Sequence, residues 1–234
     1  MKPCPDTFPF PLVALDETAS TNQYLSQLCN QLQESVAELK TVTAEFQTAG
    51  KGQRGNTWEA EEGKNLLFSF VLYPSFLEAR RQFILSQIVS LAIKEELSRW
   101  SDEITIKWPN DIYSREGRKI AGMLAELEIS ENSAFAVFGI GINADFSKLA
   151  DGELPEEIRG SAGDLFSLSI TRPELADIAV AVIGGVLKAP EYLGKVGESF
   201  AEVDWLLGRS VEVCVGNESF CGTARGVDAR GRLK

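Results

Sequence analysis

The amino-acid sequence predicts an α+β fold in which helices flank a mixed or antiparallel β-sheet. Four strand patterns follow one another with only short breaks between them, at residues 104–108, 111–113, 119–129 and 134–142. Strands joined by turns pair antiparallel, whereas a doubly wound sheet needs a helix between successive strands. Residues 65–73 are apolar on both faces, which predicts a central strand that is covered on both sides.

The N-terminal half supplies further strands and two helices. Short strands are expected at residues 10–15 and 41–46. Residues 16–22 are rich in helix-capping side chains, so a helix should follow them. Its apolar face would carry Leu25, Leu28, Cys29 and Leu32. Residues 81–100 carry isoleucine and leucine at helical spacing, which predicts a helix with a wide buried stripe.

The C-terminal part changes character near Leu207. Before it, helices are expected at residues 173–187 and 192–202, after a loop-rich segment. Beyond it, residues 211–224 read as an alternating strand, a Gly-Asn turn and a returning strand. The sequence therefore predicts a main domain at 1–206 and a small β module at 207–234.

Composition limits the classes of function. The 234 residues are 44% hydrophobic, enough for one sizeable core, and the net charge of −11 disfavours a nucleic-acid partner. No apolar run is long enough to span a bilayer, and the N-terminus lacks a signal-peptide core. The four cysteines form no Cys-x-x-Cys pair. We interpret them as reduced thiols and expect a cytoplasmic protein.

The chain contains no histidine. This excludes Ser-His and Cys-His nucleophile pairs and nearly every catalytic site for a transition metal. Catalysis would have to use lysine, arginine, carboxylates, asparagine and backbone amides.

The most informative stretch is the loop after residues 41–46. It holds three glycines, the cations Lys51 and Arg54, and Trp58, but no acidic residue. Glycines allow backbone amides to approach a ligand, the cations attract anions, and the indole offers a face for stacking. These features predict a site for a phosphorylated nucleotide, although the loop lacks the Walker spacing. A flexible surface loop is the alternative.

Two other polar features have competing interpretations. Ser20, Thr21 and Asn22 begin the first helix, where they either cap it or hold a polar ligand. In the 119–129 strand, simple alternation puts Lys119 on the same face as the apolar side chains of Ala121 and Met123. A lysine there is costly unless an anion meets it or it reaches solvent at the strand end.

Five segments occur in a fixed order, and together they carry a resemblance. They are Ser20-Thr21-Asn22, Gln47 to Gly52, Lys107-Trp108-Pro109-Asn110-Asp111, Lys119-Ile120-Ala121-Gly122 and Gly139-Ile140-Gly141-Ile142-Asn143. The set resembles the biotin protein ligases (biotin–[acetyl-CoA-carboxylase] ligases) over about residues 12–145. The resemblance implies a class II synthetase-like catalytic domain followed by an SH3-like β module, which would be incomplete here because the family's module continues for several strands.

The resemblance also implies an activity and its reactants. Such a ligase joins biotin and ATP into biotinyl-5′-adenylate, with Mg²⁺ as a further cofactor. It then transfers biotin to a lysine of the carboxyl carrier domain of acetyl-CoA carboxylase or a related carboxylase. Without a DNA-binding domain ahead of residue 12, we expect no DNA partner, and we expect no membrane partner and a monomer or weak homodimer.

Site residues follow from the matched motifs. The implied catalytic residue is Lys119. The implied biotin-binding residues are Ser20, Thr21, Asn22, Gln47, Gly50, Lys51, Gly52, Gln53, Lys119 and Gly122. The implied ATP- or adenylate-binding residues are Lys51, Arg54, Trp58, Lys107, Asn110, Asp111 and Asn143, and Asp111 is also the implied Mg²⁺ ligand.

This chain departs from the family pattern in the glycine-rich loop. The usual Gly-Arg-Gly-Arg reads Gly50-Lys51-Gly52-Gln53 here, and Asn56 stands where some members have a further arginine. Lys51 keeps its charge but loses the bidentate fork of arginine. Two alternatives therefore stay open. One is a lipoate–protein ligase, against which the Lys107–Asp111 and Lys119–Gly122 motifs argue, and the other is a protein that binds biotin or its adenylate without turnover.

The last expectation concerns the protein partner. An exposed edge strand can accept a carrier strand through backbone hydrogen bonds. We expect residues 134–142 to lie towards one side of the sheet and to serve as that edge.

Overall fold

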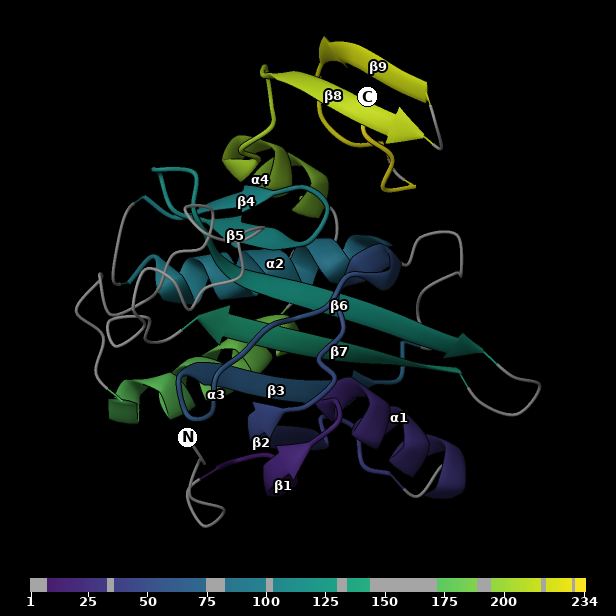
Figure 1. Cartoon of the computed structure of the whole chain (residues 1–234), viewed down its shortest axis with the longest axis vertical. Helices are drawn as coiled ribbons and strands as arrows, with labels where there is room; N and C mark the ends of the chain where they lie inside the picture. The colour runs from purple at the N-terminus through teal and green to yellow at the C-terminus, as the bar shows by residue number, and fades with distance from the viewer. Residues whose placement is uncertain are drawn as a thin grey trace.

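The protein folds around one seven-stranded mixed sheet, with a small second sheet at the C-terminal end (Figure 1). The computed structural model describes residues 8–32, 36–74, 83–99, 103–129, 134–143, 172–188, 195–215, 218–228 and 230–234. The strands of the large sheet are β1 (Leu12–Thr18), β2 (Thr41–Gln47), β3 (Asn65–Leu72), β4 (Thr105–Lys107), β5 (Asp111–Tyr113), β6 (Lys119–Ile129) and β7 (Ala134–Asn143). The helices are α1 (Thr21–Leu32), α2 (Phe83–Leu97), α3 (Arg172–Leu187) and α4 (Val196–Val203), and the second sheet pairs β8 (Ser210–Val215) with β9 (Glu218–Thr223).

The large sheet has the strand order β1-β2-β3-β7-β6-β5-β4. Strands β1 and β2 are parallel, joined through α1, and the other neighbours are antiparallel. Every residue of β3 is buried, which confirms the central strand that its two apolar faces predict. The predicted α+β class with a mixed sheet is confirmed. The expected loop-rich segment at 151–171 and the turn at 216–217 lie outside the described residues.

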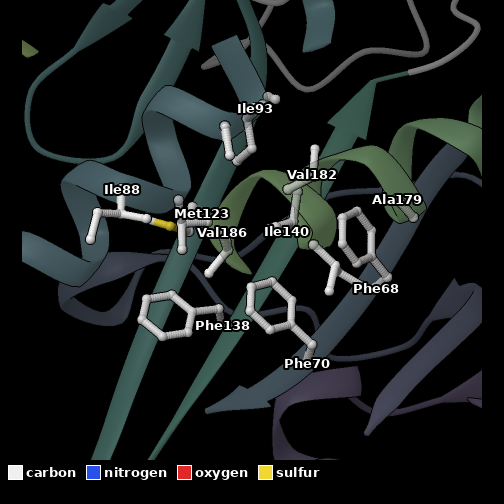
Figure 2. Packing of buried hydrophobic residues seen from close by; sticks show 14 of the residues in the cluster. Phe68, Phe70, Ile88, Ile93, Met123, Phe138, Ile140, Ala179, Val182 and Val186 are labelled. Atoms are coloured by element: carbon white, nitrogen blue, oxygen red, sulfur yellow. The ribbon is translucent and has the colours of Figure 1, made fainter. Parts of the chain in front are cut away.

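One face of the sheet carries the main hydrophobic core. Figure 2 shows Phe70, Phe138 and Ile140 of the strands packed with Val182 and Val186 of α3. The rings of Phe70 and Phe138 are stacked with their centroids 5.6 Å apart. Because α2 and α3 cover this face, the ligand site has to be built on the other one.

The opposite face is covered in part by α1. Leu25 and Cys29 of this helix pack against Val71, Phe135 and Val137. Side chains alternate between the two faces of a strand, so the β7 glycines beyond Val137 lie on this same face. The sheet surface beside the N-terminus of α1 is therefore formed by residues without side chains.

The prediction that residues 134–142 form an edge of the sheet is wrong. Strand β7 pairs with β3 from Ala136 to Asn143 and with β6 from Ala134 to Ile142. Its neighbour β3 is distant in sequence, and chain order gave no sign of that pairing. The outermost strands are β1 and β4.

The C-terminal segment is tied to the strand β4 and the turn that follows it. Ile106 forms a parallel bridge with Asp204, and the Trp205 N–H donates to the Ile106 carbonyl at 2.7 Å. The Trp108 Nε1–H donates to the Gly231 carbonyl at 3.0 Å. Burial raises the pKa of the Asp204 carboxyl, and backbone N–H groups oppose that rise. Figure 1 shows the second sheet, in yellow, beyond α4 at one end of the molecule.

Among the described residues, no helix combines the length and the apolar composition needed to cross a membrane.

Candidate active site

A pocket of about 260 Å³ opens where the N-terminus of α1, the glycine-rich loop, the turn after β4 and the middle of β6 and β7 meet. Most of the predicted site residues line it: Ser20, Thr21, Asn22, Gln47, Lys51, Gly52, Gln53, Arg54, Trp58, Asn110, Asp111, Lys119 and Gly122. It is also lined by Asn56, Thr57, Trp108, Pro109, Met123, Leu124, Gly139 and Gly141, to which sequence reasoning gave no role. Segments up to about 120 residues apart therefore form one site.

Three predicted site residues, all within the described part of the chain, do not line this pocket. Gly50 holds the base of the loop, where an added Cβ would lie 2.5 Å from the Trp58 carbonyl oxygen. Lys107 turns towards Tyr113, with its Nζ 3.1 Å from the phenol oxygen and 4.8 Å from the ring centroid. Asn143 is buried and donates from Nδ2 to the Lys119 carbonyl at 3.0 Å, so it holds the first residue of β6.

The floor of the pocket is a patch of sheet without side chains. Gly122 of β6 pairs with Gly141 of β7, and Gly139 lies two residues before Gly141 on the same face. A Cβ at Gly141 would lie 2.5 Å from Cε2 of Trp58, and one at Gly139 would lie 2.2 Å from Oδ1 of Asn22. Real Cβ atoms do not approach so closely, so the site requires glycine at both positions. The sequence contains a signal for this floor. Two glycines two residues apart in a strand leave one face of that strand without side chains.

The glycine-rich loop folds back on itself over this floor. The Trp58 N–H donates to the Gly50 carbonyl at 3.0 Å, and the Gly52 N–H donates to the Asn56 carbonyl at 2.7 Å. At the tip, Arg54 has a φ of 57°, in the left-handed region that favours glycine. The Trp58 indole lies against the glycine floor, and its buried Nε1 has no hydrogen-bond partner among the described residues. A buried indole N–H without a partner is a donor that a ligand can use.

Lys119 points into the pocket, and the face predicted for it is wrong. Uninterrupted pairing would place Tyr113 opposite Ile120, but the register shifts and Tyr113 pairs with Lys119. This bulge moves Lys119 to the face of Gly122, while Ala121 and Met123 stay in the hydrophobic core. An alternation rule applied to sequence cannot detect such a shift.

The Lys119 ammonium group has two partners in the pocket. Its Nζ lies 2.8 Å from Oδ1 of Asp111 and 5.4 Å from the centroid of the Trp58 ring. The side chains of Lys119 and Asp111 keep 32% and 20% of their exposure, so a ligand can reach the pair. The lysine is therefore held at the centre of the site by contacts that an entering anion can replace.

The N-terminus of α1 supplies a hydrogen-bonded polar cluster. Ser20 caps the helix, since its Oγ accepts from the Gln23 N–H at 3.4 Å, and it also lines the pocket. The Gln47 Oε1 accepts from Thr21 twice, from the N–H at 2.7 Å and from the hydroxyl at 3.0 Å. Asn22 is 3% exposed and donates from Nδ2 to Oε2 of Glu126 at 2.8 Å. Ser20 therefore both caps the helix and lines the pocket, so these two features do not exclude each other.

The charges in the pocket favour an anionic ligand. Among the described residues its lining includes the cations Lys51, Arg54 and Lys119 and a single acid, Asp111, although the whole chain has a net charge of −11. Cations and backbone amides together can offset the repulsion between anionic groups that are bound side by side. The described residues contain no group of three histidine, cysteine, aspartate or glutamate side chains that could hold a metal ion.

The fold is that of the protein ligase class of solved structures. The structure aligns with that of a biotin protein ligase from Aquifex aeolicus in complex with biotin and ATP, with a TM-score of 0.75 and 26% identity over 95% of this chain and 90% of that one. The model of the Biotin/lipoate A/B protein ligase family matches residues 15–143, more than half of the chain. The chain belongs to this family.

Two curated relatives show how far the likeness extends. The bifunctional ligase/repressor BirA of Escherichia coli (strain K12) is 29% identical over 92% of this chain, and the chain spans 65% of its length. The biotin–[acetyl-CoA-carboxylase] ligase of Mycobacterium tuberculosis is 27% identical over 82% of this chain and 71% of its own length.

Proposed function

We propose that the protein is an ATP-dependent biotin ligase. A carboxylate oxygen of biotin attacks the α-phosphorus of ATP, pyrophosphate leaves, and biotinyl-5′-AMP remains in the pocket. The amine of one carrier lysine then attacks the acyl carbon, AMP leaves, and the amine loses a proton as the amide forms. The observation that supports this best is Lys119, whose ammonium group lies among Asp111, Trp58 and Gly122, where a carboxylate and a phosphate can both reach it.

The two ends of the pocket suit the two substrates. The polar cluster of Ser20, Thr21, Asn22 and Gln47 offers oxygens that accept hydrogen bonds, which suits the two N–H groups of a cyclic urea. We assign the nucleotide to the other end, where the face of Trp58 and the side chains of Arg54 and Asn110 lie on the lining.

Mg²⁺ fits the pocket only together with the nucleotide. Among the described residues, Asp111 is the one carboxylate on the lining, and Mg²⁺ is commonly held by one or two carboxylates and substrate phosphates. When bound, the ion would neutralise charge on the phosphates, and Asp111 would hold it while Lys119 turned to the reacting carboxylate.

The acceptor that we propose is a lysine of a biotin carboxyl carrier domain, as in acetyl-CoA carboxylase. The catalytic reactions would belong to a domain at residues 1–206. The β module at 207–234 would contact it at Trp108, whose Nε1–H donates to the Gly231 carbonyl.

The polar cluster also argues against lipoate as the substrate. The dithiolane ring of lipoate has no N–H group, so it could not donate hydrogen bonds to the oxygens of Thr21, Asn22 and Gln47, whereas the cyclic urea of biotin could. A direct test is pyrophosphate release with ATP and biotin, with lipoate in place of biotin, and with ATP alone. We expect release only with biotin. Release with lipoate alone, or tight biotin binding without any release, would contradict the proposal.

Gln53 gives a prediction that is specific to this chain. It lines the pocket where the family pattern has arginine, and an arginine can make charge-assisted, bidentate bonds to a phosphate. We expect Gln53→Arg to slow dissociation of biotinyl-5′-AMP by about tenfold, the effect of one such bond. The measurement is the release rate of radiolabelled adenylate from a preformed complex.

The matched control is Gln27→Arg, which adds the same charge on an exposed position of α1. It should leave the release rate unchanged. Equal rates for wild type and Gln53→Arg would show that residue 53 does not hold the adenylate.

A further inference from the structure

Glu126 does not line the pocket, but it is hydrogen-bonded to Asn22, a pocket-lining residue of the polar cluster. Its Oε2 accepts a hydrogen from Asn22 Nδ2 at 2.8 Å, and the Leu124 carbonyl lies 3.2 Å from the same nitrogen. At the other end of the amide, Oδ1 of Asn22 lies 2.7 Å from the Ser69 hydroxyl. A carboxylate only accepts hydrogen bonds, so it requires the nitrogen of Asn22 to face it and the oxygen to face Ser69.

The orientation of the Asn22 amide decides how many hydrogens the polar cluster has to donate to its own oxygens. Three contacts connect its oxygens: Thr21 to Gln47 at 3.0 Å, Ser69 to Thr21 at 2.8 Å, and Ser69 to Asn22 at 2.7 Å. Only two hydroxyl hydrogens are available, one from Thr21 and one from Ser69. One of the three oxygen–oxygen contacts therefore always lacks a hydrogen. If the Asn22 amide turned over, its NH₂ group would donate to Ser69 and remove that shortage.

We propose that Glu126 is a positioning residue for biotin, acting through Asn22. By fixing the amide, Glu126 leaves the polar cluster with fewer donor hydrogens than acceptor contacts. The side of the pocket formed by Thr21, Asn22 and Gln47 therefore binds a ligand with N–H donors. This inference rests on the proposed function, because it assigns the cyclic urea of biotin to that side of the pocket. It adds a residue that does not itself line the pocket.

A second contact of the same kind provides a matched control. Two residues further along β6, Oε2 of Glu128 accepts from Nδ2 of Asn30 at 2.8 Å, again joining the strand to α1. This pair is exposed and lies away from the pocket lining. If Glu126 merely fastened the helix to the sheet, removing either carboxylate would have the same consequences.

The experiment compares Glu126→Ala, Glu126→Gln and Glu128→Ala. Biotin affinity is measured by titration calorimetry, and KM for biotin and for ATP by pyrophosphate release. We expect Glu126→Ala to raise the Kd and KM for biotin about tenfold, the weight of one charge-assisted hydrogen bond, with a change in KM for ATP below about twofold. Glu126→Gln retains an acceptor and should recover part of the affinity. Glu128→Ala should change neither constant, although both alanine variants should lower Tm slightly.

A double variant tests whether Glu126 acts through Asn22. In an Asn22→Ala background, Glu126→Ala should cause no further loss of biotin affinity. Undiminished biotin affinity in Glu126→Ala, or the same loss in Glu128→Ala, would overturn the role of Glu126 while leaving the ligase proposal intact. Wild-type protein that neither binds biotin nor releases pyrophosphate would overturn both.

Discussion

Replacing Lys119 with alanine is expected to reduce pyrophosphate release by at least about 100-fold, the usual cost of removing a group that stabilises charge in a transition state. The reacting carboxylate and phosphate are both anions, and the ammonium group 2.8 Å from Asp111 is the cation held nearest the glycine floor. The fold should persist, because a partly exposed ion pair contributes at most about 1 kcal/mol to stability. Adenylate formation and thermal unfolding are measured on the same preparation.

Lys64→Ala is the control for Lys119→Ala. Lys64 also forms an ion pair, with Glu61, but does not line the pocket. It should retain normal pyrophosphate release. If Lys119→Ala retained it too, Lys119 would be only a lysine that reaches solvent at the end of a strand.

Gly139→Ala is expected to have the largest combined effect on stability and binding. The new methyl group would lie 2.2 Å from Oδ1 and 2.7 Å from Cγ of Asn22, whose amide is hydrogen-bonded to Glu126, Leu124 and Ser69. The amide has to leave this position, which overpacks the interface with α1 and leaves buried polar groups unpaired, for a loss of about 3 kcal/mol in the free energy of unfolding. Denaturant unfolding and biotin calorimetry check the two effects.

The cause can be isolated by making room for the methyl group. In an Asn22→Ala background the amide is absent, so Gly139→Ala should cost much less stability, while biotin affinity stays low. Gly184→Ala, at a helical position of α3 where an added Cβ meets nothing within 4 Å, should not destabilise the protein. An equal loss of stability from Gly139→Ala in both backgrounds would show that the contact with Asn22 is not the cause.

The strands and helices could be predicted because their signals are local. The two apolar faces of residues 65–72 and the helical spacing in 83–97 depend only on neighbouring residues, and both elements occur where expected. The order of strands depends on pairing between distant segments. Strand β7 is central because β3 pairs with it across more than 60 residues, and no local pattern reports that contact.

In the candidate site, too, local features could be predicted and those that depend on distant contacts could not. The motifs predicted most of the polar and charged residues that line the pocket, but Lys107 and Asn143 lie outside its lining. The face of Lys119 was predicted wrongly because a one-residue bulge reverses the alternation. Glu126 had no signal of its own, since its partner Asn22 lies 104 residues away. The roles assigned to individual residues stay predictions until the variants are measured.

The hydrogen bond between Trp108 and Gly231 has a consequence for chimeric proteins built from two members of the family. One end of it is a ring that lines the pocket, and the other is a main-chain carbonyl, which any sequence supplies. The turn itself requires glycine, because a Cβ at residue 231 would lie 2.3 Å from the Phe83 ring. A C-terminal segment transplanted from another member should therefore need glycine at that turn to keep this hydrogen bond.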